Sequence, residues 1–401
     1  MISIGNEPRT LDHQCLDAPG GFLWWYVDLI DARGNGLVLI WSFGLPFLPG
    51  YAHAARAGRA QAAGERPSLN VAVYKGGKLD CYLLQEYTPA QVEWEPEGGS
   101  WRFGKTRIHT RIEGDQRVVD VALDCPMPAG AGRLTGSVRV QGRAPKLEAK
   151  IPENVVSPAG FERDHAWIPL AVPARGEAKL RCGEVRYEFS GRAYHDCNVG
   201  ARPLHDLGIN HWLWGRAAFE NKRAETIERV YYALWPEGTK PQRSPEGARC
   251  FGLEFHPDGR VEHVENLRIE LLEERRNLGG VVWWPHFALY RTEEAEPWMV
   301  VTQKSAVDSG PFYMRHITEN QHGDGARAVG FNEVICPERV DLSRHRPLVS
   351  MRVHHADESS DAAAKDDKNS IWLPLFTGPR RGRVRRLGRQ AVVALLGRGE
   401  A

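Results

Sequence analysis

The chain has 401 residues and a formal net charge of +1, from 52 Lys and Arg against 51 Asp and Glu. A nearly neutral chain gives no electrostatic reason to expect nucleic acid as a partner. The length exceeds the needs of one all-β unit, so we expect two packed units. The seven cysteines are scattered and form no C-x-x-C pair, which favours reduced thiols in the cytoplasm over disulfides or a zinc site.

The N-terminal sequence MISIGNEPRTLDHQ carries acidic residues where a secretory signal would be basic and then apolar. The longest apolar run, GLVLIWSFGLPFLPGY, is broken by glycine and proline, so we expect no membrane-spanning helix. These features predict a cytoplasmic protein, either free or held at the surface of the inner membrane.

Most of the chain is typical of short strands, rich in β-branched and aromatic residues and separated by turn sequences such as GNG, KGG and HPDG. Many of them alternate apolar and polar residues, as in RVVDVALDC, which predicts one buried face per strand. The strands are too many for one sandwich or barrel. We therefore expect an all-β fold of two antiparallel β-barrel or sandwich units packed together, with few short helices.

An alanine-rich segment predicts a helix around residues 49–65, and a proline-rich segment at roughly 155–178 is interpreted as the connection between the two β units. The expected organisation is an N-terminal β unit over residues 1–160, a C-terminal β unit over 161–356, and a different kind of segment over 357–401.

That last segment begins with the polar, acidic stretch 357–370, which predicts an exposed linker. Seven arginines then accompany Val, Leu and Ala against a single acid, Glu400. Such a basic amphipathic segment could lie on an anionic membrane surface. A frayed, soluble basic tail fits the pattern equally well.

The stretch Gly191–Arg216, GRAYHDCNVGARPLHDLGINHWLWGR, gathers acids, imidazoles and indoles at the expected rim of a barrel. Asp196 is a candidate general acid. If it faces Tyr194, Trp212 and Trp214, lost hydration would raise its pKa and keep it protonated near neutral pH. The indole faces could stabilise a developing cation.

His195 could orient the Asp196 carboxyl or hold a water molecule. The structural alternative is that Asp196 and Asn198 only cap backbone amides of a loop. Cys197 is expected to be a buried, inert thiol. A metal site can also be assembled on ligand type alone, but its spacings match no zinc pattern, so we expect no metal. Its ligands would be His195, Asp196, His205, Asp206 and His211.

A second constellation lies in PGGFLWWYVDLID, where alternation places Trp24, Tyr26 and Asp28 on one face of a strand. A carboxylate beside two aromatic rings indicates either a barrel rim or a functional pocket. Glu86, which closes another strand, is open to the same two interpretations. The alternative for each carboxylate is a salt bridge at the rim.

These sequences resemble the carotenoid 1,2-hydratase family, the hydroxyneurosporene synthases. APGGFLWWYVDLID, GLVLIWSFGLPFLPGYAHAARA, SLNVAVY and LLQEY are similar to the opening of the family. GRAYHDCNVGARPLHDLGINHWLWGR resembles its second hallmark, a Gly-x-x-Tyr loop with Asp, Asn and Gly followed by a Trp-rich strand. SGPFYMRHI and AVGFNEVICPERV resemble its C-terminal strands. The similarity runs in order over roughly residues 16–355 and leaves the basic tail outside.

The resemblance implies two lipocalin-like β-barrel units, a hydrophobic isoprenoid substrate and no cofactor. An acid would protonate a terminal isopropylidene double bond, and water would capture the tertiary cation. We expect Asp196 to be that acid, with His195 and Tyr194 supporting it. The residues expected to bind the substrate are Trp24, Tyr26, Asp28, Glu86, Asn198, Trp212, Trp214, Tyr231 and Tyr232.

Two departures from the family pattern bear on this interpretation. Hydratases tend to carry His-Asn-Trp after the loop aspartate, where this chain has Cys197, Asn198 and Val199. The family's proton donor is thought to be an aspartate near a tyrosine at the end of the next strand, where this chain has Ala233 or Leu234. If that acid is missing, Asp196, Asp28 or Glu86 must supply the proton, or the reaction needs none.

Two alternatives therefore stay open. One is a pericyclase, terpenoid cyclase or isomerase that holds an isoprenoid or polyketide in a folded shape and needs no essential acid. The other is a non-catalytic carrier of apolar ligands.

Overall fold

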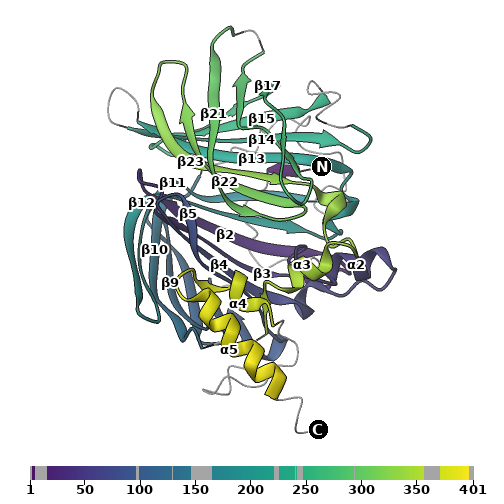
Figure 1. The fold of residues 1–401 in the computed structure, drawn as a ribbon. Helices are drawn as coiled ribbons and strands as arrows, with labels where there is room; N and C mark the ends of the chain where they lie inside the picture. Colours follow the sequence, from purple (N-terminus) through teal and green to yellow (C-terminus); the bar gives the residue numbers. More distant parts are fainter. Residues whose placement is uncertain are drawn as a thin grey trace.

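The computed structural model describes residues 2–4, 16–95, 99–128, 130–145, 165–220, 225–239, 241, 247–292, 294–355 and 371–396. Two large, curled β-sheets dominate these residues and pack face to face, one above the other in Figure 1. The all-β fold class with two curled, lipocalin-like units is confirmed. Within the described residues, no helix combines the length and the apolar character needed to cross a membrane.

The first sheet, the lower one in Figure 1, has 14 strands among the described residues. Along its main path the strands are β24 (Val353–His354), β5 (Lys78–Glu86), β4 (Pro67–Lys75), β3 (Gly36–Phe43), β2 (Phe22–Ile30), β12 (Val185–Gly200), β11 (His165–Cys182), β10 (Arg133–Arg143), β9 (Gln116–Pro126), β8 (Thr106–Glu113), β7 (Ser100–Phe103) and β6 (Val92–Glu95). Two short strands join from the side: β1 (Ile2–Ile4) pairs with β11, and β25 (Gly378–Pro379) pairs with β5.

The second sheet has nine strands among the described residues. In order they are β16 (Val261–Val264), β15 (Arg249–Phe255), β14 (Thr226–Pro236), β13 (Ile209–Glu220), β23 (Arg327–Ile335), β22 (Tyr313–Gln321), β21 (Pro297–Ser309), β20 (His286–Tyr290) and β17 (Arg268–Leu272). A separate two-stranded hairpin consists of β18 (Arg275–Arg276) and β19 (Val282–Trp283).

The helices are short, as expected. They are α2 (Tyr51–Arg56), α3 (Arg346–Ser350), α4 (Leu373–Phe376) and α5 (Arg383–Leu396), with single 3-10 turns η1 (Ala63–Glu65), η2 (Pro89–Gln91), η4 (Leu204–Asp206) and η6 (Pro337–Arg339). The helix predicted over 49–65 is wrong in extent, because Gly58 has a positive φ of 68° and closes α2 after one and a half turns.

The middle strands of each sheet are buried on both faces. All nine residues of β2 are buried, for example. Trp25 and Val27 point into a core enclosed by the first sheet, whereas Trp24 and Tyr26 point into an aromatic layer between the two sheets. Our expectation of one buried and one polar face is therefore wrong for these strands, because a second sheet covers the face that water would otherwise reach.

The chain passes from the first sheet to the second between Gly200 and Ile209, because β11 pairs with β10 and β12 pairs with β2. The first sheet therefore includes β11 and β12, and the division expected between two β units at residues 160 and 161 stays a prediction. The proline-rich stretch expected as a connection is part of a strand from His165 onward, and its Pro169 and Pro173 fall at two register shifts of β11.

The basic tail folds back onto the first sheet. Arg386 of α5 is buried and donates hydrogen bonds to the carbonyls of Pro379 and Arg381, at distances of 2.5 and 2.9 Å. Since β25 pairs with β5, this contact holds the start of α5 against the sheet edge. The acidic linker expected over 357–370 lies outside the described residues.

A buried ion cluster joins the two sheets. Arg216 of β13 donates to Asp28 of β2 with an Nε–Oδ2 distance of 2.9 Å, and to Glu228 of β14 with an Nη1–Oε1 distance of 2.7 Å. All three side chains are fully buried. Burial raises the pKa of Asp28, which Arg216 opposes, and raises the pKa of Glu228 to about 7. The guanidinium of Arg216 therefore stabilises the two carboxyls that are buried between the sheets.

We predict that Arg216→Met lowers the free energy of unfolding by about 3–5 kcal/mol, because it leaves both carboxyls buried without their cation. Urea denaturation followed by tryptophan fluorescence measures this change. The control is Arg33→Met in an exposed turn, where the change should stay within about 0.5 kcal/mol. Equal stability of the two variants would contradict the role given to Arg216.

Candidate active site

Strand pairing places Asp196 in the aromatic layer. β12 lies antiparallel to β2, with Asp196 opposite Tyr26 and Asn198 opposite Trp24. Because side chains alternate along a strand, Tyr194, Asp196 and Asn198 face the second sheet. Cys197, between them, points into the core of the first sheet.

The Asp196 carboxyl is surrounded by hydrogen-bond donors. Its Oδ2 accepts from Trp167 Nε1 at 2.7 Å and from the Tyr194 hydroxyl at 2.8 Å, and its Oδ1 accepts from Asn198 Nδ2 at 3.0 Å. His165 Nε2 lies 2.8 Å from Asn198 Oδ1 and fixes the orientation of that amide. The carboxyl is therefore held in one position by three neighbours, rather than serving as a loop cap.

Burial raises the pKa of Asp196 to about 8, although hydrogen bonds from Trp167 and Tyr194 act to lower it. The negative charges of Glu333 and Asp28 raise the pKa further. A carboxyl with this pKa is largely protonated at neutral pH and can act as a general acid.

Asp196 lies in the wall of a cavity of about 590 Å³ between the sheets. Aromatic side chains from both sheets form much of the wall, and two of them, Tyr26 and Trp214, meet edge to face at 5.5 Å between ring centroids. The aromatic residues that line the cavity are Trp24, Tyr26, Phe47, Tyr82, Trp212, Trp214, Tyr232, Phe312, Tyr313 and Phe376.

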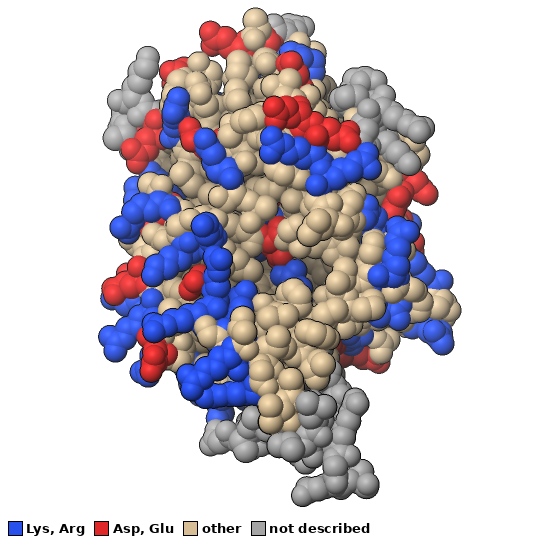
Figure 2. Space-filling view, viewed as in Figure 1, with Lys and Arg blue, Asp and Glu red and all other residues tan. Residues whose placement is uncertain are grey.

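The cavity opens beside the β18–β19 turn and the C-terminal helices, because Leu278 and Leu348 line it and are also largely exposed. Figure 2 shows a hollow near the centre of this face, with acidic and basic side chains visible inside it. A volume of this size lies within the range of about 300–1,000 Å³ that is typical of small-molecule sites.

A second polar group in the wall was missed by the sequence analysis. Arg315 of β22 and Glu333 of β23 are direct cross-strand partners, with an Nε–Oε1 distance of 2.8 Å. Both line the cavity, and so do Asn70 and the ion pair of Arg352 with Asp308. The available signal was a single Arg in the stretch FYMRHI and a single Glu in the stretch GFNEVI.

Seven of the predicted site residues line the cavity: Trp24, Tyr26, Asp196, Asn198, Trp212, Trp214 and Tyr232. Tyr194 lies directly behind Asp196 as one of its donors. The strand phase also distinguishes two neighbours in β14: Leu234 points into the aromatic layer, whereas Ala233 points into the core of the second sheet. The position at which the resemblance implied an acid is therefore apolar in either case.

Four predicted site residues lie elsewhere. His195 is on the opposite face of β12 from Asp196, where its Nδ1 is 2.9 Å from the Tyr26 carbonyl and its ring stacks on Trp41. The expectation that His195 supports Asp196 is therefore wrong, because adjacent residues of a strand point to opposite faces of the sheet. Tyr231 points into the second core, where Asn332 Nδ2 donates to its hydroxyl at 2.9 Å.

The two remaining carboxylates form ion pairs. Asp28 binds Arg216 in the buried cluster, and Glu86 binds Arg66 at the sheet edge. The salt-bridge alternative therefore describes both, and neither lines the cavity.

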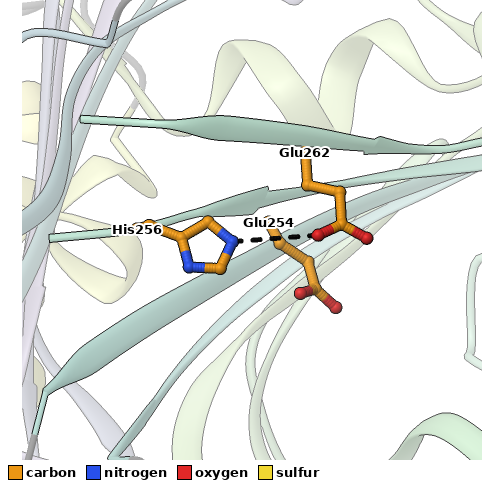
Figure 3. Close-up of side chains that lie close together, drawn as sticks. All are labelled: Glu254, His256 and Glu262. Carbon is orange, nitrogen blue, oxygen red and sulfur yellow. Dashed lines mark ion pairs between the residues drawn. The ribbon is translucent and has the colours of Figure 1, made fainter. Parts of the chain in front are cut away.

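Among the described residues, one group of side chains is close enough together to hold a metal ion. It contains none of the five residues named above as possible ligands. Glu254 of β15, His256 directly after that strand and Glu262 of β16 lie close together (Figure 3). However, Glu254 pairs with Arg229 at 2.8 Å, and Arg291 reaches both Glu254 and Glu262, at 3.3 and 3.1 Å. Arginines already neutralise these carboxylates, so we interpret the group as an ion-pair network.

Comparison with known proteins places the chain in a family. A family model described as carotenoid hydratase CrtC matches residues 39–360. The chain is 28% identical over 319 residues to a hydroxyneurosporene dehydrogenase of Chlorobaculum tepidum, covering 75% of this chain and 78% of the relative. It is also 28% identical over 307 residues to an acyclic carotenoid 1,2-hydratase of Rubrivivax gelatinosus, covering 75% of this chain and 66% of the relative.

The fold is similar to the crystal structure of a protein of Nitrosomonas europaea assigned as AttH, with a TM-score of 0.53 and 12% identity. That match covers 80% of this chain and 93% of the other. The resemblance seen in the sequence is confirmed, as is the expectation of a hydratase- or cyclase-type enzyme on this fold. The chain belongs to the carotenoid hydratase CrtC family.

Proposed function

We propose that this protein adds water across a terminal C=C bond of a hydrophobic isoprenoid, with Asp196 as the proton donor. The observation that carries the proposal is a carboxyl with a pKa of about 8 in the wall of an aromatic cavity. The acyclic carotenoid 1,2-hydratase of Rubrivivax gelatinosus supports this class of substrate and reaction.

In the proposed reaction, the Asp196 proton moves to the terminal alkene carbon and leaves a tertiary cation. The indole rings of Trp24, Trp212 and Trp214 in the cavity wall would stabilise that cation by cation–π attraction. The hydrogen bonds from Trp167 and Tyr194 to Oδ2 would stabilise the carboxylate that remains. Water then captures the cation.

A second candidate is cyclisation in the same cavity. The apolar Leu234, where the resemblance implied an acid, favours it, since a cyclase would hold its substrate in a folded shape without that group. A carrier of apolar ligands would bind the same compounds and release them unchanged.

We predict that Asp196→Asn lowers turnover by about 10²–10⁴-fold while the fold is retained, because an amide cannot donate the proton. The measurement is incubation with lycopene or neurosporene in heavy-oxygen water, followed by mass spectrometry of the products. Asp206→Asn, which changes a half-exposed carboxylate in η4, is the matched control and should keep full activity. A labelled alcohol formed by Asp196→Asn at the normal rate would refute the assignment, and an unlabelled isomer from the unaltered protein would favour the cyclase.

We further predict the direction of the pH dependence. Because the acid form of Asp196 is the active one, kcat/KM should fall as the pH rises through about 8, and should not fall for this reason at lower pH. The profile is measured between pH 6 and about 9.5 with folding monitored in parallel. A flat profile would contradict acid catalysis by Asp196.

We also propose that the mouth of the cavity meets an anionic membrane surface, where an isoprenoid would be dissolved. Val384 and Val392 of α5 are exposed, as is Trp372 just before α4. Arg385 and Arg389 are exposed on the same helix. Figure 2 shows Lys and Arg gathered to the left and lower left of the hollow. Apolar and basic side chains together are typical of helices that bind at membrane interfaces.

We predict that the double variant Arg385→Glu and Arg389→Glu weakens sedimentation with phosphatidylglycerol-containing vesicles by at least about tenfold, since each basic residue contributes about 1 kcal/mol at an anionic surface. The control exchanges two other exposed arginines and should bind normally: Arg260→Glu in the turn between β15 and β16, and Arg327→Glu at the start of β23. Equal loss in both variants would indicate a general effect of net charge and would contradict a specific role of the tail.

A further inference from the structure

The cavity wall contains a second carboxylate, Glu333, which has no part in the proposed proton transfer from Asp196. Glu333 is nine-tenths buried, lines the cavity, and gives one oxygen, Oε1, to Arg315 Nε at 2.8 Å. Among the described residues, the hydrogen bond and the ion pair of Glu333 both use Oε1 and both go to Arg315. Arg315 is itself fixed from the other side, because its Nη1 donates to the Tyr74 hydroxyl at 3.0 Å.

Asp196 and Glu333 face the same cavity. They lie in the two opposing sheets and both line the cavity. The charge of Glu333 is one of the causes that raise the pKa of Asp196, so the two carboxyls are close enough to interact. A pair in which one member is protonated and the other is paired with a guanidinium has the division of roles that acid–base addition needs.

Three hydrogen-bond donors without a partner in the same wall indicate that a polar molecule such as water binds there. The indole nitrogens of Trp212 and Trp214 and the hydroxyl of Tyr313 are buried and have no partner among the described residues. Trp212 and Trp214 are more than nine-tenths buried, and all three residues line the cavity. Buried donors in native proteins are normally paired, with water when no protein group is available.

We propose that Glu333 is the second catalytic residue, whose Oε2 holds the attacking water and accepts a proton from it. This inference rests on the proposed hydration. The O–H bond of Asp196 breaks as the alkene electron pair forms the new C–H bond. The water oxygen then forms the C–O bond to the cation, and one of its protons passes to Glu333. The net reaction adds one water molecule to the alkene. Glu333 then loses its proton to solvent, and Asp196 takes up a proton from solvent.

The test separates protonation from capture by water. Protein is incubated with lycopene or neurosporene in deuterated, heavy-oxygen water, and mass spectrometry follows two products: labelled alcohol, and substrate carrying deuterium at its end groups. In Glu333→Gln, we expect labelled alcohol to fall at least about 10²-fold, because the base is gone. Deuterium exchange should persist. Asp196 still transfers a deuteron to the alkene, and a cation that captures no water loses a proton and returns to the alkene with deuterium in it.

Two further variants serve as comparisons. Glu319→Gln, a half-exposed carboxylate on the neighbouring part of β22, is the matched control and should behave as the unaltered protein. Glu333→Ala with added formate should regain part of the alcohol yield, which a merely structural role of Glu333 would not produce. If Glu333→Gln does not fold, Glu333→Asp is tested for the same fall in the ratio of alcohol to exchange.

The outcomes distinguish the two proposals. If the unaltered protein makes no labelled alcohol, the proposed hydration fails, and this inference fails with it. If that protein hydrates and Glu333→Gln hydrates equally well, only the role of Glu333 is overturned. That role is also overturned if alcohol formation and deuterium exchange fall together, because Glu333 would then act on protonation or on structure.

Discussion

The removal of water from Asp196 by two packed sheets is the constraint on which the rest of the site depends. A carboxyl at a barrel rim would be solvated and ionised, and could not donate a proton at neutral pH. Here the second sheet covers β12, and the pKa of Asp196 rises to about 8. The aromatic layer that excludes water also forms the wall against which an apolar polyene can pack.

Burying polar groups in that layer requires partners, and the structure supplies them in three ways. Asp196 is held by donors that carry no charge, so its protonated form remains accessible. Asp28 and Glu228 share the guanidinium of Arg216 instead, and this cluster joins the sheets rather than reacting. Glu333 has a guanidinium to itself, because its Oε1 accepts from Arg315 Nε. These three environments are the reason why we propose different roles for the carboxyls.

The cavity is thus shared by the two sheets rather than enclosed by either one. The first sheet lines it with residues of β2, β3, β4, β5 and β12, and the second sheet with residues of β13, β14, β21, β22 and β23. Two of the departures from the family pattern, Cys197 and Val199, lie in the core of the first sheet and do not reach the cavity. The departure at Leu234 does face the aromatic layer, and Asp196, the proton donor that we propose, lies on the opposite sheet.

The fold class could be predicted from the sequence. So could the position of Trp24, Tyr26 and Asp196 in the cavity wall, because alternation in two strongly aromatic strands is a local property. The sequence could not choose between Tyr231 and Tyr232, since the phase of β14 depends on which sheet covers it. His195 was misplaced although alternation alone puts it opposite Asp196. Glu333 was missed because its meaning comes from the register with Arg315, a pairing between strands that composition does not reveal.

The protonation state of Asp196 is the central claim, and infrared difference spectroscopy of the resting protein tests it directly. We expect the protonated-carboxyl band, assigned by its absence in Asp196→Asn, to persist at pH 7 and to disappear with a midpoint near 8. A midpoint near 4, the value of an ordinary aspartate, would contradict this claim, because Asp196 would then be ionised and could not start the reaction.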